Sequence, residues 1–262
     1  FVNGVPIVTA ELKNALTDQT AGHAMAQYRS DRDPKAPIFR FKRRALVHFA
    51  VGSDRVSMTT RLAGADTFFL PFDRGDGTAA GNRAVKGKHR THYLWEQVWQ
   101  RDSLLDVVAR FMHLQVTDRE DGATRGADGR TRRREAMIFP RYHQLDCVRR
   151  LVAATRDAGA GANYLVQHSA GSGKSNSIAW LAHQLIGLSG ADGKAMFDSV
   201  IVVTDRRILD KQIRETIKGH GERPVNENDV CSAVMYPKVF ADYENHRREF
   251  GRVDRLPTPV FF

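Results

Sequence analysis

The pattern of hydrophobic and polar positions in the first third of the chain predicts a strand-rich α/β unit. Apolar, β-branched runs at 5–13 (VPIVTAELK), 45–51 (ALVHFAV) and 55–62 (RVSMTTRL) are typical of buried strands. Only Gly-Ser-Asp separates the last two runs, which therefore predict an antiparallel pair joined by a tight turn. Residues 14–27 predict a helix, and TFFLPF at 67–72 predicts a further strand.

The middle of the chain predicts one long helix and then a break between domains. Apolar side chains recur at helical spacing between residues 94 and 112, so one face of this helix should belong to the core. Residues 116–135 (VTDREDGATRGADGRTRRRE) are polar, interrupted by glycine and without periodicity. This composition favours a linker or long loop.

Beyond the linker, helices and strands alternate. An amphipathic helix is expected at 142–155, a short strand at 163–169, a helix at 176–188, a buried strand at 198–205 and a helix at 206–217. This order is typical of a parallel α/β domain.

Composition narrows the class of partner. The 262 residues are 42% hydrophobic and 27% charged, as in ordinary soluble globular proteins. The net charge of +10 favours a polyanionic partner, nucleic acid before membrane, although a basic surface can also serve solubility alone. The two cysteines suit a reducing compartment, and no run reaches the ~18 apolar residues of a membrane span. The chain starts without Met inside an expected strand, so we expect a fragment.

A glycine-rich segment, HSAGSGKSNSIAW (168–180), carries the clearest chemistry. It lies between an expected strand and an expected helix, which is the context that a phosphate-binding loop requires. Backbone N–H groups from Gly171 to Ser175 would surround a β-phosphate, Lys174 would reach the β- and γ-oxygens, and Ser175 would ligate Mg²⁺. The alternative is a glycine-rich turn without a ligand.

Two residues qualify this site. His168 stands where the strictest pattern has its first glycine, a position that begins the turn and lies farther from the phosphates. Gln144, in FPRYHQ (139–144), precedes Lys174 by 30 residues. A glutamine amide can pair with the donor and acceptor edge of adenine, so we expect Gln144 to read the base rather than to be a simple surface residue.

A second candidate site is the Glu-x-Lys pair of the first expected strand. Glu11 and Lys13 are two residues apart and therefore point to the same face. Glu11 would hold a divalent metal ion, and Lys13 would position or polarise the attacking water. Taken alone, such a pair is more often a salt bridge at a strand edge. The full nuclease signature also needs an Asp from a preceding strand, and no acidic residue precedes Glu11.

Six separated stretches, in order, closely resemble the motor-and-nuclease subunit of type I restriction enzymes. Together they span about residues 1–219 and read FVNGVPIVTAELKN, HAMAQYRSDRDP, LWEQVWQRDSLLD, FPRYHQLD, YLVQHSAGSGKSNSIAWLAHQL and DSVIVVTDRRILDKQI. The resemblance implies a PD-(D/E)xK-type nuclease domain followed by a superfamily 2, RecA-like motor. It also implies ATP and Mg²⁺ as cofactors, double-stranded DNA as substrate, the specificity and methyltransferase subunits as partners, and a cytoplasmic location.

The resemblance also implies roles for single residues. Glu11 and Lys13 match the nuclease residues, with Glu11 as a metal ligand, and Gln144 matches the adenine-reading glutamine. The loop residues that match the first helicase motif and its nucleotide site are Ala170, Gly171, Ser172, Gly173, Lys174 and Ser175. Thr204, Asp205 and Arg206 fall in the next motif, which contacts the DNA backbone in that family.

Three departures limit what this chain can do by itself. The nuclease Asp of the family would lie upstream of residue 1. Some members carry Gln-x-x-x-Tyr in the helix after Glu-x-Lys, whereas here Tyr28 has Ala24 four residues before it and Gln27 beside it. No DExH box is present. We therefore expect a fragment that neither cuts DNA nor hydrolyses ATP efficiently.

The end of the chain has a different resemblance. Residues 222–262 are similar to the segment that closes the carboxyltransferase region of pyruvate carboxylases, through YPKVFADY, HRREFG and LPTPVFF. These residues are neither catalytic nor biotin-bearing in that family. The simplest hypothesis is a junction near 219–223 between two unrelated coding sequences, and the alternative is a divergent helicase segment. A helix is expected around 238–249.

The sequence thus predicts an α/β chain in four parts. These are a nuclease-like domain lacking its first strand or strands, a linker, the first part of a RecA-like ATPase domain and a tail of uncertain fold, at 1–115, 116–136, 137–221 and 222–262. The preferred function is part of the ATP-dependent DNA-translocating and DNA-cleaving subunit of a restriction system. The alternatives are a superfamily 2 ATPase with a DNA-binding, non-cleaving N-terminal domain, and a non-catalytic assembly module related to carboxylases.

Overall fold

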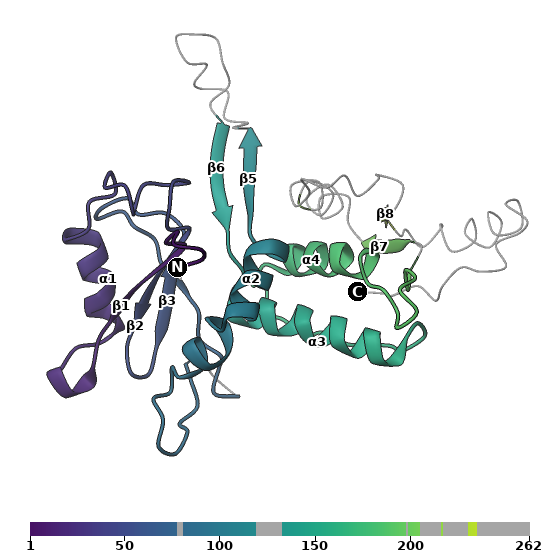
Figure 1. Cartoon of the computed structure of the whole chain (residues 1–262), viewed down its shortest axis with the longest axis horizontal. Helices are drawn as coiled ribbons and strands as arrows, with labels where there is room; N and C mark the ends of the chain where they lie inside the picture. The colour runs from purple at the N-terminus through teal and green to yellow at the C-terminus, as the bar shows by residue number, and fades with distance from the viewer. Residues whose placement is uncertain (78–80, 119–132, 198, 205–215, 217–229, 235–262) are drawn as a thin grey trace, which may run out of the picture. The chain divides into compact units, whose positions relative to one another are not determined.

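The structure is a computed structural model whose contacts divide the chain into two compact units, residues 1–143 and 144–262 (Figure 1). We describe each unit by itself. The residues that the structure describes are 1–77, 81–118, 133–197, 199–204, 216 and 230–234. Among the helices within these ranges, none combines the length and the apolar character needed to cross a bilayer.

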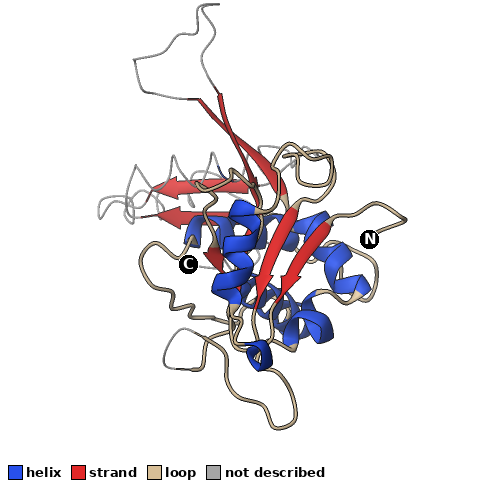
Figure 2. Cartoon of the chain, turned by 90° about the vertical axis from the view of Figure 1, so that its left-hand side faces the viewer, coloured by secondary structure: helices blue, strands red, loops and turns tan. Residues whose placement is uncertain are grey.

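The first unit is built on a four-stranded sheet in the order β1-β2-β3-β4. Figure 1 labels the first three of these strands, and Figure 2 colours helices and strands by type. Strand β1 (Val8–Leu12) runs parallel to β2 (Val47–Val51), which pairs antiparallel with β3 (Val56–Thr59). These three strands and the tight turn between β2 and β3 confirm the prediction. Strand β4 (Leu70–Pro71) keeps only two residues of the expected 67–72 run.

The expected helix at 14–27 is divided in two. The Asn14 side chain accepts a hydrogen bond from the Leu16 N–H (3.0 Å) and starts the short 3₁₀ helix η1 (Ala15–Thr17). Asp18 then takes a left-handed conformation, φ 54°, which ends η1. Helix α1 begins only at Ala21 and runs to Ser30. Local side-chain hydrogen bonding thus overrides helical periodicity at this point.

Helix α1 packs against β1 and β2 and buries one end of the core. Ala24 and Tyr28 on α1, Ala50 on β2 and Leu62 after β3 form one buried cluster. A second cluster is aromatic, with edge-to-face contacts among Phe49, Phe72, Trp99, Phe139 and Tyr142. Burying aromatic side chains is among the largest apolar contributions to stability that a core can contain.

The expected long helix after residue 94 is also divided, and its predicted apolar face is only partly correct. A π-helical turn, η2 (Leu94–Val98), closes where the Trp99 N–H donates to the Leu94 carbonyl at 2.6 Å. Helix α2 (Arg101–Arg110) follows after Gln100. Three of the side chains predicted to face the core, Leu94, Val98 and Phe111, are buried. The predicted Leu104, Val108 and Met112 are only half-buried and Leu105 is exposed, whereas Val107, which was not predicted, is buried.

The predicted linker is wrong at both of its ends. Strands β5 (His113–Asp118) and β6 (Arg133–Ile138) pair antiparallel, from His113 opposite Ile138 to Asp118 opposite Arg133. The Thr60 hydroxyl donates to the Met137 carbonyl at 2.8 Å, and Lys42 pairs with Glu135 at 2.6 Å. These contacts fix the hairpin to the rest of the first unit, so the polar composition of these two ends does not mean a lack of structure. Residues 119–132 lie outside the described residues.

The second unit contains most of α3 (Tyr142–Ala158), followed by α4 (Lys174–Ile186), β7 (Val200–Thr204) and β8 (Val230–Val234). Both helices and β7 confirm the predicted elements. Strands β7 and β8 are parallel, in register from Val200 opposite Val230 to Thr204 opposite Val234. The expected helices at 206–217 and 238–249 lie outside the described residues, apart from residue 216.

The strand expected at 163–169 is not formed. These residues make an irregular segment before the glycine-rich loop, and the Leu165 side chain is 95% exposed. A strand needs a neighbour that takes up its backbone hydrogen bonds. The described partner of β7 is β8, so the apolar sequence at 163–169 supplies strand propensity without supplying a pairing partner.

Candidate functional site

The glycine-rich loop has the backbone shape that its sequence predicts. Gly171 and Gly173 take left-handed conformations, with φ of 72° and 82°, which side chains disfavour. Gly173 is the residue before helix α4, so Lys174 is the first helical residue. The expected helix start at 176 therefore moves two residues earlier, because the loop runs directly into the helix.

The start of α4 leaves backbone donors directed out of the helix. The first intrahelical hydrogen bonds come from the N–H groups of Asn176 (3.1 Å) and Ser177 (3.4 Å) to the Gly173 carbonyl. Lys174 and Ser175 precede them, and their N–H groups belong to the helix end that favours anions. The Lys174 side chain is exposed and Ser175 is half-buried, so both can reach a ligand at this end.

Gln144, on the first turn of α3, braces the loop. Its side chain is buried, and Nε2 donates to the carbonyls of Gly173 (2.8 Å) and Ser172 (3.3 Å). A Cβ placed on Gly173 would lie 2.5 Å from the same nitrogen. The amide N–H₂ group that is predicted to read adenine is thus directed at the loop backbone, a contact that the sequence did not predict.

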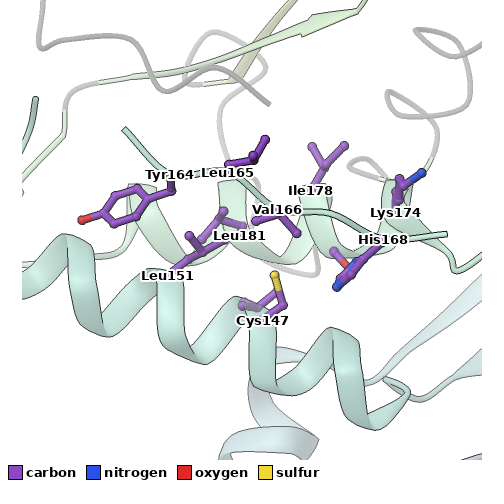
Figure 3. A pocket seen from close by; sticks show the side chains of 11 residues that line it. Cys147, Leu151, Tyr164, Leu165, Val166, His168, Lys174, Ile178 and Leu181 are labelled. Atoms are coloured by element: carbon purple, nitrogen blue, oxygen red, sulfur yellow. The ribbon is translucent and has the colours of Figure 1, made fainter. Parts of the chain in front are cut away.

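An apolar pocket adjoins the loop (Figure 3). It has a volume of about 160 Å³ and lies among α3, α4 and the irregular segment. His168 and Lys174 stand at the same end of it in Figure 3, away from Tyr164 and Leu151. Burial and then the Lys174 charge lower the pKa of His168, so the imidazole is neutral at pH 7. At the position of the missing glycine, the chain therefore adds no second positive charge.

Glu11 and Lys13 are close in sequence but differ in what they contact. Glu11 on β1 accepts a hydrogen bond from Arg32 Nε (2.7 Å), and Arg32 Nη2 lies 2.6 Å from the same carboxylate oxygen. Lys13 follows the last residue of β1 and extends the pairing, since its N–H donates to the Val51 carbonyl at 2.8 Å. The carboxylate expected to hold a metal ion is thus engaged by a guanidinium group.

A buried polar chain that the sequence did not reveal lies beside Glu11. The Thr9 hydroxyl is 2.8 Å from the Tyr28 hydroxyl and 2.7 Å from His48 Nδ1. Burial lowers the pKa of His48 to about 4 and, with the Glu11 charge as a smaller cause, raises the pKa of Tyr28. The available signal was Thr9 itself, two residues before Glu11 on the same face of the strand.

The described residues near Glu11 do not fit a metal ion. Within the described ranges, no group of three or more His, Cys, Asp or Glu side chains is arranged to hold one. Glu11 supplies one carboxylate, its nearest charged neighbour is Arg32, and His48 bonds Thr9. A divalent cation normally takes several oxygen ligands. We therefore derive no catalytic step through a metal ion at this place.

The third predicted group is only partly described. Thr204 is the last residue of β7, and its backbone pairs with Val234. Asp205 and Arg206 lie outside the described residues.

Comparison with known proteins shows a similarity to a class of ATPase. Residues 143–235 match the SWI2/SNF2 ATPase family. This range contains the glycine-rich loop, α3, α4 and β7. It also contains β8, which the sequence analysis places in the carboxylase-like tail.

A particular relative is a restriction enzyme. The chain is 26% identical over 219 residues to the type I restriction enzyme HindI endonuclease subunit of Haemophilus influenzae. The match covers 82% of this chain and 19% of that protein. Together with the ATPase match, it supports in general terms a DNA-dependent ATPase or restriction-enzyme subunit.

A shorter likeness is of a different kind. Over 52 residues the chain is 38% identical to pyruvate carboxylase of Staphylococcus aureus, and over 53 residues it is 43% identical to pyruvate carboxylase 1 of Caenorhabditis elegans. Each match covers 20% of this chain and 4% of the carboxylase. The chain thus spans a fifth or less of every relative named here. No solved structure matches the chain.

Proposed function

We propose that this chain is part of the motor-and-nuclease subunit of a type I restriction system, in which ATP binding is coupled to movement along double-stranded DNA. The observation that carries the proposal is the glycine-rich loop, with two left-handed glycines, Lys174 opening α4 and Gln144 bonded to the loop backbone. The similarity over 219 residues to a restriction-enzyme subunit supplies the biological context.

In this proposal the loop binds the phosphates of ATP. The N–H groups at the start of α4 and the Lys174 ammonium group provide positive potential, and the Ser175 hydroxyl is the protein ligand for Mg²⁺. Ala170 and Gly171 are exposed and leave room for the phosphates. Bound Mg²⁺ would neutralise phosphate charge, while the chain's own residues bind and orient the nucleotide. Gln144 keeps the loop in shape and reads adenine only if its amide leaves the loop carbonyls.

Nucleotide binding tests this part of the proposal. Lys174→Ala should weaken binding of a non-hydrolysable ATP analogue by about 10- to 100-fold, as expected for the loss of a charge-assisted contact of roughly 1.5–3 kcal/mol. Lys194→Ala is the matched control, because Lys194 is an exposed lysine on the same unit away from the loop. Calorimetric titration of both variants gives the answer. Equal affinities for the two variants would contradict the proposal.

Turnover tests whether the chain is a complete motor. We expect little ATP hydrolysis with or without DNA, because no DExH box is present to hold Mg²⁺ and the hydrolytic water. DNA-stimulated hydrolysis that Lys174→Ala abolishes would show that this expectation is wrong. The same proposal includes three further points. Thr204, Asp205 and Arg206 contact the DNA backbone. The chain assembles with specificity and methyltransferase subunits, and its location is cytoplasmic.

A second candidate function follows from the ion pair at Glu11. If the first unit binds DNA without cutting it, Glu11 has a structural role and Arg32 is its permanent partner. If it is a nuclease, Glu11 and Lys13 act only once Arg32 has moved and further metal ligands have joined. The test uses a chain extended upstream so that the nuclease Asp is restored. Mg²⁺-dependent nicking of plasmid DNA by this longer chain, lost on Glu11→Ala, would support the nuclease. Absence of nicking by the longer chain supports the DNA-binding unit.

The third alternative, a carboxylase-related assembly module, is least supported. The carboxylase likeness covers 20% of the chain, and of residues 222–262 the structure describes only β8. The glycine-rich loop has no place in such a module. Failure of ATP analogues to protect the fold against unfolding would restore this alternative.

A further inference from the structure

A basic turn on the first unit is not used by either candidate site. Residues 83–90 (RAVKGKHR) are all exposed. The Lys88 N–H donates to the Val85 carbonyl at 3.1 Å, and Gly87 has φ of 73°, so the chain reverses at these residues. We refer to 83–90 as the basic turn, and its cationic or titratable side chains are Arg83, Lys86, Lys88, His89 and Arg90.

The basic turn is held firmly at its C-terminal end. The Arg90 N–H donates to the Ser53 carbonyl at 3.1 Å, and the buried Thr91 hydroxyl donates to the Gly52 carbonyl at 2.9 Å. Tyr93 is fully buried, and its hydroxyl donates to the Phe72 carbonyl at 2.6 Å. These bonds tie the turn to the end of β2 and to the aromatic core. A charged surface held in this way loses little conformational entropy when it binds a partner.

An open groove separates the basic turn from η2. It is lined by Gly87, Lys88, His89, His92, Trp95 and Glu96 and has a volume of about 500 Å³. This lies within the ~300–1,000 Å³ typical of small-molecule sites. Trp95 is 41% exposed, whereas Trp180 is fully buried. The groove therefore has an aromatic wall on one side and cationic side chains on the other.

The groove contains a single carboxylate, and that carboxylate is neutralised. Both oxygens of Glu96 accept hydrogen bonds from Lys88 Nζ, each at 2.8 Å, and His92 Nε2 lies 3.9 Å away. Within the part of the chain that the structure describes, the side chains of Lys86 and Arg90 form no hydrogen bond or ion pair. Positive charge is thus left available in the basic turn, on residues next in sequence to Gly87 and His89, which line the groove.

We propose that this groove binds a single strand of DNA, with one base stacked on Trp95 and the neighbouring phosphates on Lys86 and Lys88. Sites for single strands combine a cationic groove with aromatic side chains on which bases stack. In a duplex the faces of the bases are covered by their neighbours, so Trp95 can stack only on an unpaired base. The proposal deepens the DNA-binding part of the proposed function, since it adds a strand-holding surface beside the nuclease-like sheet.

The tryptophan fluorescence of the chain provides the test, and the signal lost in Trp95→Phe is the part that comes from Trp95 among the three tryptophans. Full-length chain is titrated with a 12-nucleotide oligothymidine and, separately, with a duplex of the same length, at low salt and without nucleotide. We expect the single strand to quench fluorescence and to bind at least tenfold more tightly than the duplex. Trp95→Ala should weaken single-strand binding about tenfold, measured by fluorescence anisotropy of labelled DNA, and Trp95→Phe should restore most of it.

Charge variants distinguish binding of DNA in this groove from nonspecific attraction of DNA to a basic protein. Lys86→Glu should weaken binding about tenfold, whereas Lys194→Glu, the same change at an exposed position on the other unit, should have little effect. Glu96→Gln should strengthen binding because it releases Lys88. Equal loss in the two lysine variants, or unchanged binding by Trp95→Ala, would overturn the proposal. The assay contains no ATP and leaves Lys174 intact, so its failure is distinct from failure of the ATP-binding proposal.

Discussion

Gly173 combines two constraints in one residue. Its φ of 82° disfavours any side chain, and a Cβ there would lie 2.5 Å from the Gln144 amide nitrogen that donates to the loop. Gly171 has a similar φ of 72°, but a Cβ on it would meet open space. Substituting Gly171 therefore tests backbone strain alone, whereas substituting Gly173 tests backbone strain together with a steric clash with Gln144.

Gly173→Ala should destabilise the chain by about 2–4 kcal/mol and weaken ATP-analogue binding more than tenfold. The backbone strain of roughly 1–3 kcal/mol is joined by loss of the buried Gln144 hydrogen bond. Gly171→Ala is the control and should show only the backbone part. Urea unfolding and calorimetric titration of both variants measure the two effects. Equal destabilisation would mean that Gln144 does not pack against Gly173 in solution.

His48 makes the stability of the first unit depend on pH. Its pKa is about 4 in the folded chain against 6.5 when unfolded, because burial disfavours the imidazolium ion. The unfolded chain therefore binds the proton first. The stabilising contribution is complete above pH 6.5 and is lost as pH falls from 6.5 through 4, up to roughly 3 kcal/mol.

The measurement is the free energy of unfolding in urea at pH 7.5 and pH 4.5. His48→Gln, which keeps a polar group beside Thr9, should show a smaller decline between these two values than the unmodified chain. His23 is the control, since it is exposed on α1 and His23→Gln should leave the decline unchanged. If the free energy of unfolding falls equally between the two pH values in the unmodified chain, His48→Gln and His23→Gln, His48 is excluded as the source of the pH dependence.

At the scale of elements, the segment at 163–169 shows that an apolar run does not form a strand without a pairing partner. Its sequence is that of a buried strand, yet it pairs with neither β7 nor β8, and Leu165 is 95% exposed. In α4, Leu185 is 1% exposed and packs in the core of the second unit. The two leucines have the same side chain in opposite environments.

Leu165→Ala should change the free energy of unfolding by less than about 0.5 kcal/mol, whereas Leu185→Ala should lower it by about 2–5 kcal/mol. Unfolding of both variants in urea, followed by circular dichroism, tests this expectation. A large effect of Leu165→Ala would show that the segment is buried in solution.

The hairpin β5–β6 is the reverse case, in which strands form although the sequence predicts a linker. Its sequence reads as a polar linker, but β5 and β6 pair along their whole length, and Thr60, Lys42 and Phe139 fix its base to the first unit. Backbone pairing does not require an apolar pattern when neither face of the ribbon is deeply buried. Composition alone therefore did not reveal this pairing.

At the scale of the whole molecule, charge is the main property that bears on function. The net charge of +10 is a sequence fact, and any nucleic acid that the chain binds must release counterions when its phosphates are neutralised. Affinity for duplex DNA should therefore fall at least tenfold between 50 and 200 mM salt. A titration series in NaCl measures the slope, and an affinity independent of salt would mean that the basic surface does not contact DNA.

The sequence by itself determined where β1, β2, β3, α3 and α4 lie and where the glycine-rich loop begins α4. Apolar, β-branched runs predicted the three strands, helical periodicity predicted the two helices, and the glycine spacing located Lys174 and Ser175, since all of these depend on residues near one another in the chain. The family match at 143–235 agrees with that part of the interpretation.

Only the tertiary structure decided which groups meet. It placed Gln144 on the loop carbonyls, Arg32 on Glu11, and Thr9 between Tyr28 and His48. It also paired β5 with β6 and left residues 163–169 without a strand partner among the described strands. Each of these outcomes depends on hydrogen-bond partners that are distant in sequence. The local sequence pattern sets the propensity and spacing of residues. Strand pairing and burial depend on which distant segments lie within hydrogen-bonding distance in the folded chain.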